Sequence, residues 1–166
     1  ASRRDFALHQ NLLSRSMTMN ALYSLAYISK NTIKGDRDVI EAEIKSILAS
    51  AHKNNPALNV TGALLYSGGY FCQVIEGPEE VLEELFENIQ LDSRHGQVTV
   101  LHFEPIEKRS FGEWAMAFAG IEDEMRFDAA GILDSKDKIK AEEAGRNLVS
   151  TLDRLVTQHQ GVLKNA

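Results

Sequence analysis

Two polar residues interrupt stretches of sequence that are otherwise mostly apolar, and they are the first candidates for chemistry. Tyr27 stands within residues 22–29, and Gln73 stands within residues 70–76. Because alternate residues of a strand share a face, Gln73 is predicted to face the same core as Phe71. A buried amide destabilises a core unless it is hydrogen-bonded, and a phenol can both donate and accept such a bond. The sequence therefore predicts a buried Tyr27–Gln73 hydrogen bond, for which a structural role in the core is the simplest interpretation.

A second set of polar side chains follows the two predicted helices. Asn54 and Asn55 come after the first helix, and Arg94 and His95 come after the second. Taken singly, the asparagines are typical of a helix end, and Arg94 with His95 is typical of a solvated loop. Taken together, the four side chains could surround a gap between the helices. Carboxamides there would bind the edge of a flat heteroaromatic ring, and Arg94 and His95 would meet an anionic tail.

The sequence carries none of the common signatures of a catalytic site. It has no glycine-rich phosphate loop, no nucleophile elbow and no paired histidines at metal-binding spacing. The single cysteine, Cys72, excludes an internal disulfide and a multi-cysteine metal site, and it is predicted to be a small buried hydrophobe. The net charge of −6 disfavours nucleic-acid binding, and no apolar run reaches membrane-spanning length. A free thiol suits the cytoplasm, where we expect the protein.

Apolar periodicity predicts the elements that must position these residues, in the order β-α-β-β-α-β-β. The expected strands and helices are residues 22–29, 39–53, 60–66, 70–76, 78–89, 97–103 and 111–119. This order predicts an α+β ferredoxin-like sandwich, in which a five-stranded mixed sheet carries both helices on one face. Strict alternation places Trp114 and Met116 on one face of the last strand.

Three local signals refine this prediction. Asp36 or Asp38 is expected to cap the first helix, and residues 54–56 (Asn-Asn-Pro) are expected to stop it. Residues 67–69 (Ser-Gly-Gly) predict a tight hairpin turn. Further along, residues 122–133 are predicted as a short helix and residues 138–158 as a longer one. The apolar stripe of the longer helix serves either as a cap on the open face of the sheet or as an interface; both alternatives remain open.

Several linked motifs resemble the BLUF family of blue-light photoreceptor domains. They are Asn-Asn-Pro at residues 54–56, Val-Thr-Gly-Ala-Leu-Leu-Tyr at 60–66, Phe-Cys-Gln-Val-Ile-Glu-Gly at 71–77, Asp-Ser-Arg-His at 92–95, Arg-Ser-Phe at 109–111 and Trp-Ala-Met at 114–116. The motifs occur in the family's order and extend over residues 22–120. The resemblance implies a flavin-binding domain at residues 21–120. Residues 1–20 have no counterpart in the family and are interpreted as an N-terminal extension, and the helical pattern within residues 121–166 predicts a C-terminal helical cap.

The resemblance also implies roles for individual residues. Tyr27 matches the family's photochemical tyrosine, and Gln73 matches its switching glutamine. Trp114 and Met116 match a pair on the last strand that relays the signal. Six more residues match flavin-contact positions: Ile47, Asn54, Asn55, Ile89, Arg94 and His95.

The function implied by the resemblance is that of a photoreceptor that binds FAD non-covalently and performs no net substrate turnover. Light would rearrange the hydrogen bonds among tyrosine, glutamine and flavin, give a reversible red-shifted signalling state, and change contacts with another protein. We expect an unidentified downstream protein and a homo-oligomer as partners, without nucleic acid or membrane. Two alternatives compete: a flavin-free ferredoxin-like module that binds a small ligand or dimerises, and a small hydrolase like the acylphosphatases, for which no phosphate loop is found.

Overall fold

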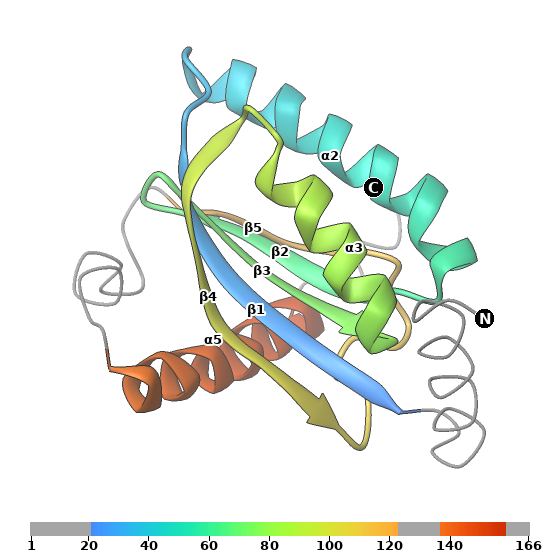
Figure 1. Ribbon diagram of the computed structural model, residues 1–166. Helices are drawn as coiled ribbons and strands as arrows, with labels where there is room; N and C mark the ends of the chain where they lie inside the picture. Colours follow the sequence, from blue (N-terminus) through green and yellow to red (C-terminus); the bar gives the residue numbers. More distant parts are fainter. Residues whose placement is uncertain (1–20, 123–136, 159–166) are drawn as a thin grey trace, which may run out of the picture.

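The computed structural model describes residues 21–122 and 137–158 (Figure 1). Apart from Glu122, the short helix predicted at residues 122–133 lies outside the described residues. In chain order, the elements are β1 (Leu22–Asn31), α2 (Arg37–Leu58), β2 (Thr61–Ser67), β3 (Tyr70–Gly77), α3 (Glu79–Gln90), β4 (His95–Ile106), β5 (Ala117–Glu122) and α5 (Lys138–Gln158). Among the described helices, none is both long enough and apolar enough to cross a membrane.

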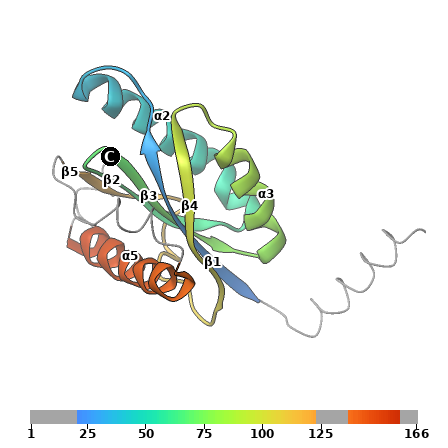
Figure 2. The ribbon, with the colours of Figure 1, turned by 60° about the vertical axis from the view of Figure 1, so that its left-hand side comes forward.

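Within the described residues, one sheet of five strands runs in the order β4-β1-β3-β2-β5. β1 pairs antiparallel with β3 and β4, β2 pairs antiparallel with β3, and β5 pairs parallel with β2. Helices α2 and α3 cover one face of the sheet, and α5 crosses the other (Figures 1 and 2). The predicted ferredoxin-like α+β fold with a mixed sheet is therefore confirmed.

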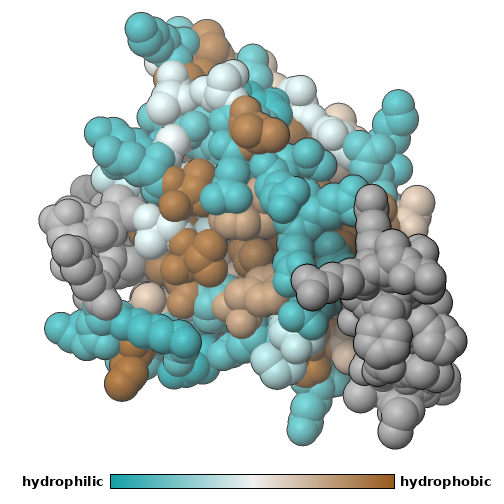
Figure 3. All heavy atoms as spheres, viewed as in Figure 1, coloured by the Kyte–Doolittle hydropathy of each residue, from teal (hydrophilic) through white to brown (hydrophobic). Residues whose placement is uncertain are grey.

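Helix α5 is a cap on the sheet, which settles the alternative that the sequence left open for its apolar stripe. The helix spans the predicted residues, and its buried positions recur at helical spacing: Gly145, Leu148, Leu152, Leu155 and Val156. The side chains of Leu148, Leu152, Leu155 and Val156 join a core formed by one face of the sheet. Figure 3 shows the outer surface of the molecule in the orientation of Figure 1. Hydrophobic side chains lie at the centre of this surface, and hydrophilic ones surround them.

The sheet separates two cores, because successive strand residues point to opposite faces. Ala26, Cys72 and Val74 face α5, whereas Tyr27 and Phe71 face α2 and α3. Cys72 is completely buried, as predicted, and burial raises the pKa of its thiol to about 12. The thiol therefore stays protonated at neutral pH and packs as a small hydrophobe.

The first helix has one of its two predicted caps, but it begins two residues earlier than predicted and ends later. Asp36 caps α2 by accepting a hydrogen bond from the Val39 N–H at 3.1 Å. The predicted stop at residues 54–56 is wrong, since α2 continues to Leu58 with Pro56 inside it. A proline in the last turn removes only one backbone hydrogen bond, so the helix tolerates it there.

The end of α2 is closed by backbone hydrogen bonds instead. The Val60 N–H donates to Asn55 O at 3.0 Å, and the Asn59 N–H donates to Pro56 O at 3.2 Å. This is the pattern of a Schellman motif, which requires a residue in the left-handed region. Asn59 supplies it with a φ of 59°. The added turn keeps Asn55 on the helix, where its side chain reaches the sheet.

The hairpin turn is confirmed, and the last strand is corrected. Gly68 and Gly69 both have positive φ, which a two-residue turn between β2 and β3 requires. The strand predicted at residues 111–119 begins only at residue 117, because the preceding residues form a turn in which the Trp114 N–H donates to Phe111 O at 3.0 Å. Trp114 packs against the core under α5, whereas Met116 belongs to the core under α2 and α3, so the predicted common face is wrong.

A buried histidine lies beneath α5. The His102 side chain is 2% exposed, and its Nε2 lies 2.9 Å from Ser24 Oγ. Its Nδ1 is buried and has no hydrogen-bond partner. On α5, Gly145 leaves room for the ring, because a Cβ at this position would collide with it. The helix can therefore pack directly over the imidazole.

Burial is the main reason why the pKa of His102 is lowered, since it disfavours the charged ring. Among the nearby charges, Glu104 opposes this shift, Arg146 reinforces it, and Glu142 opposes it. His102 is therefore neutral at physiological pH in the folded protein, although it is protonated more readily once the chain unfolds.

We expect the free energy of unfolding to fall on acidification. Because the folded pKa of His102 lies below its unfolded value, the stabilisation from the neutral ring is fully present above about pH 6.5. It is lost as the pH falls through the folded pKa. Urea unfolding at pH 7.5 and pH 5 measures this loss, with His102→Gln as a non-titrating control. If His102→Gln lost as much stability between pH 7.5 and pH 5, the loss could not be attributed to protonation of His102.

Candidate functional site

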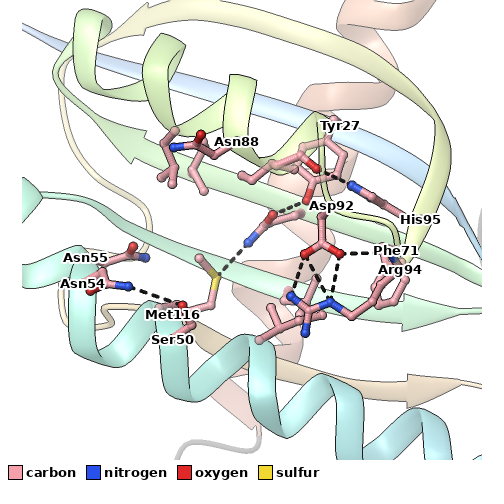
Figure 4. Close-up of a pocket in the computed structure, with 17 residues that line it drawn as sticks. Tyr27, Ser50, Asn54, Asn55, Phe71, Asn88, Asp92, Arg94, His95 and Met116 are labelled. Atoms are coloured by element: carbon pink, nitrogen blue, oxygen red, sulfur yellow. Dashed lines mark hydrogen bonds and ion pairs between the residues drawn. The ribbon is translucent and has the colours of Figure 1, made fainter. Parts of the chain in front are cut away.

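A cavity of about 220 Å³ lies between α2, α3 and the sheet (Figure 4). The sequence analysis singled out ten site residues, and nine of them line it: Tyr27, Ile47, Asn54, Asn55, Gln73, Ile89, Arg94, His95 and Met116. Trp114 is not among the lining residues and lies on the opposite side of the sheet. The fold thus brings together residues that are almost 90 positions apart in the chain.

A chain of hydrogen bonds forms the floor of this cavity. Tyr27 and Gln73 are direct cross-strand partners on β1 and β3. As predicted, the Tyr27 hydroxyl donates to Gln73 Oε1. At the other end of the amide, Nε2 donates to Met116 Sδ at 3.4 Å. All three side chains are nearly inaccessible, with exposures of 3%, 6% and 2% respectively.

The two ends of the Gln73 amide have unequal partners. A phenol O–H is an ordinary donor, but a thioether sulfur is a weak acceptor. Burial raises the pKa of Tyr27 well above its ordinary value, and the Asp92 carboxylate adds to this shift. The phenol therefore remains a neutral donor, while the N–H₂ end of the amide is held weakly and can take a better acceptor.

His95 is fixed beside Tyr27 by two contacts. Its Nε2 lies 2.6 Å from Ile89 O, and its Nδ1 lies 2.6 Å from Ser29 Oγ. Because a carbonyl can only accept, Nε2 carries a proton, and in the neutral ring Nδ1 accepts from the serine hydroxyl. The ring meets Tyr27 edge-on, with centroids 6.1 Å apart. His95 therefore forms part of the cavity wall, with both of its nitrogens engaged inside the protein.

The two asparagines at the end of α2 have different environments. Asn55 is 3% exposed, and its Nδ2 donates to Ala115 O at 2.8 Å. Asn54 is exposed, and its Nδ2 donates to Ser50 Oγ one helical turn earlier at 3.3 Å. Asn55 thus fixes the chain beside Met116 as well as lining the cavity, whereas Asn54 contributes at its edge.

An ion pair lies on the cavity wall. Arg94 Nη2 lies 2.6 Å from Asp92 Oδ2, and Nε donates to the same carboxylate. Glu43 Oε2 lies 3.5 Å from Arg94 Nη1. The side-chain hydrogen bond from Arg94 is the main reason why the pKa of Asp92 is lowered. The sequence analysis quoted Asp92 in a motif but gave it no role; its spacing of two residues from Arg94 is the signal that could have found it.

The residues of the cavity fit a planar heteroaromatic ring with an anionic extension. Ile47 and Ile89 provide apolar contacts from opposite helices, and carboxamides at Asn55 and Gln73 can pair with ring nitrogens and carbonyls. Arg94 lines the same cavity and would meet an anionic extension by exchanging its present pairing with Asp92 or Glu43. Within residues 21–122 and 137–158, no cluster of three or more His, Cys, Asp or Glu side chains is placed to hold a metal ion.

Comparison with known proteins agrees with this geometry. The family model described as sensors of blue-light using FAD matches residues 22–117. The chain is 35% identical over 101 residues to the photoactivated adenylate cyclase subunit beta of Euglena longa, which covers 60% of this chain and 11% of that protein. It therefore spans about a tenth of the length of this relative.

Solved structures of similar proteins also include a BLUF protein. The dark-state structure of BlrB, described as a BLUF protein, has a TM-score of 0.61 and 32% identity, with 83% of this chain and 96% of that chain covered. A structure of Klebsiella pneumoniae BlrP1 with FMN and cyclic diGMP has a TM-score of 0.53 and 34% identity, with 58% of this chain and 25% of that chain covered.

Proposed function

Because this chain belongs to the BLUF family, the sensors of blue light that use FAD, we propose that it is a blue-light photoreceptor whose switch is the Gln73 amide. The observation that carries the proposal is the buried hydrogen-bond chain from Tyr27 through Gln73 to Met116 at the floor of the cavity. The Gln73 amide in this chain has a strong hydrogen-bond partner, the Tyr27 hydroxyl, and a weak one, the Met116 sulfur, and it can therefore exchange its hydrogen bonds.

The cofactor of the proposed switch is FAD, bound without a covalent bond. When bound, the flavin would supply the absorption of blue light and an excited ring able to take an electron from a nearby phenol and to return it, so that no net oxidation remains. The choice of FAD over FMN rests on the family's description. The residues proposed to hold it are Tyr27, Ile47, Asn54, Asn55, Gln73, Ile89, Arg94 and His95.

The protein's part in the switch follows from the donor and acceptor ends of one side chain. With the Tyr27 hydroxyl bound to Oε1, the N–H₂ group of Gln73 faces the Met116 sulfur. If the amide rotates or tautomerises, its donor and acceptor ends meet different partners. A new donor toward the flavin would shift absorption to longer wavelength. Tyr27 remains buried and neutral, so the original hydrogen bonds can re-form in the dark and no substrate is consumed.

The proposed output is a change in contacts with another protein rather than catalysis. Residues 21–120 form the proposed sensor domain, and residues 121–166, which include α5, form the proposed cap. Trp114 contacts the core under α5 and Met116 the core under the flavin site, so their segment is the proposed relay between the two faces. We propose a cytoplasmic homo-oligomer that acts on a separate downstream protein. The matching cyclases show that the same type of domain also occurs within much longer proteins.

The absorption spectrum of the purified protein before and after blue light tests this function. A bound flavin whose band moves reversibly to longer wavelength is the expected result. A bound flavin without a shift would remove the switch but keep the binding site. A protein that neither contains flavin nor binds added flavin would return the flavin-free ligand-binding module as the better interpretation.

A further inference from the structure

Glu76 is a fully buried acid outside the cavity. It lies on β3, three residues after Gln73 and on the opposite face of the sheet, with an exposure of only 1%. A buried carboxylate is stable only when its oxygens are hydrogen-bonded. Its hydrogen-bond partners therefore indicate what this acid does for the fold.

Both carboxylate oxygens of Glu76 bind the chain that leads to Met116. The Ser110 N–H donates to Oε2 at 2.7 Å, and the Phe111 N–H donates to Oε1 at 2.9 Å. The Thr61 hydroxyl also donates to Oε1, at 3.2 Å. Hydrogen bonds from backbone N–H groups to a carboxylate are stronger than neutral ones. Glu76 thus fixes the beginning of the segment formed by residues 109–116, here called the crossing segment.

Arg109 fastens the same end of the crossing segment to neighbouring elements. Its Nη1 donates to Glu76 O at 3.0 Å and to Thr61 Oγ1 at 2.8 Å. Its Nη2 donates to Asn59 O at 2.8 Å. The Phe111 side chain is buried to 1% exposure under α5. This end of the segment is therefore attached to β2, β3 and the end of α2.

The other end of the crossing segment is attached to the switch. Gly62 N–H donates to Trp114 O at 3.2 Å, and Asn55 donates to Ala115 O. The Met116 side chain then lies against Gly62, where a Cβ would be 3.2 Å from the methionine Cε, and receives the hydrogen bond from Gln73. Gln73 and Glu76 are therefore linked in two ways. They are joined directly along β3, and they are also joined through the crossing segment and the Met116–Gln73 hydrogen bond.

We propose that Glu76 is a positioning residue of the switch, which holds the crossing segment so that the Met116 sulfur stays against the Gln73 amide. The role in the light response rests on the proposed function, whereas the placement of Met116 does not. The Glu76 side chain touches neither the cavity nor the amide, and its hydrogen bonds reach the switch through the crossing segment. Loosening the segment should give the amide more freedom to return to its dark arrangement.

The placement is tested first in the dark, by the ¹³C-methyl signal of Met116 in the flavin-loaded protein. Glu76→Gln keeps the size of the side chain but removes the charge and one of the two acceptors. We expect the Met116 signal to shift or broaden. Glu107→Gln removes the same charge from an exposed position near the crossing segment and should leave the signal in place. An unchanged signal in Glu76→Gln overturns the proposal, whether or not the protein responds to light.

The consequence for the switch is tested by dark recovery after blue light. We expect Glu76→Gln to recover about fivefold faster or more, which corresponds to about 1 kcal/mol at 1.4 kcal/mol per tenfold. The same substitution made in Met116→Ala should have little further effect, because the two residues act through one contact. An equal acceleration in both backgrounds would show a general loosening of the fold and overturn the positioning role.

If the Glu76→Gln protein does not fold, a milder variant can test the same placement of Met116. Thr61→Val keeps the shape of the side chain but removes the hydroxyl that joins Glu76 to Arg109. It should move the Met116 signal in the same direction by a smaller amount. A folded Thr61→Val protein with an unmoved signal would count against the proposal in the same way.

Discussion

Gln73→Leu is expected to abolish the light-induced red shift while the flavin stays bound. Leucine nearly matches the volume of glutamine but has neither a donor nor an acceptor, so no rearrangement of hydrogen bonds can follow excitation. The walls of the cavity, including Ile47 and Ile89, are unchanged. The Tyr27 hydroxyl loses its acceptor, which is expected to destabilise the fold by about 1–3 kcal/mol. The difference spectrum after blue light measures the effect.

The control for this variant is the same substitution on the surface. Gln90→Leu at the exposed end of α3 should leave the red shift unchanged. The flavin content of both purified proteins must also be compared, because an empty cavity gives no red shift for a trivial reason. A normal, reversible red shift in a flavin-loaded Gln73→Leu protein would exclude the Gln73 amide as the switch.

Asn55→Ala is expected to weaken flavin binding about tenfold or more. The side chain is buried, and the family resemblance implies that it contacts the flavin ring directly. Its loss would leave a polar group of the bound ring unpaired, which costs about 1–3 kcal/mol, and 1.4 kcal/mol corresponds to a factor of ten in affinity. The Ala115 carbonyl also loses its donor, which destabilises the fold with and without flavin. Titration of the flavin-free protein with FAD, followed by flavin fluorescence, measures the change.

The neighbouring asparagine provides the matched control. Asn54→Ala removes the same group from an exposed position whose hydrogen bond is with Ser50 on the same helix. It should weaken binding much less than Asn55→Ala. Equal losses of affinity in the two variants would contradict the argument from burial.

The sequence was sufficient to predict most of the fold and the floor of the cavity. Alternation of apolar residues placed Gln73 and Phe71 on one face, and helical spacing gave α5 its bounds. The Tyr27–Gln73 hydrogen bond followed from the cost of burying an unpaired amide. The face of Gln73 and the bounds of α5 could be predicted because both depend on the local period of the chain, which the fold preserves.

The predictions that failed depend on hydrogen bonds that the pattern of apolar residues does not indicate. Alternation could not separate Trp114 from Met116, since the turn before β5 is held by the Glu76 carboxylate more than 30 residues away. The predicted helix stop before Pro56 failed because backbone hydrogen bonds from Asn59 and Val60 close α2 one turn later. Apolar periodicity indicates neither the long-range contacts of Glu76 nor the local backbone hydrogen bonds that close α2.

The position of β5 has a consequence for how the domain opens. This short strand lies at one edge of the sheet and pairs, among the described strands, only with β2, whereas β1 and β3 each have two partners. Elements with few partners separate at a lower free energy than those at the centre of a fold. Brief fraying of β5 would therefore loosen the chain directly after Met116 while the rest of the domain stays folded. One edge of the described sheet thus adjoins the amide that we propose as the switch.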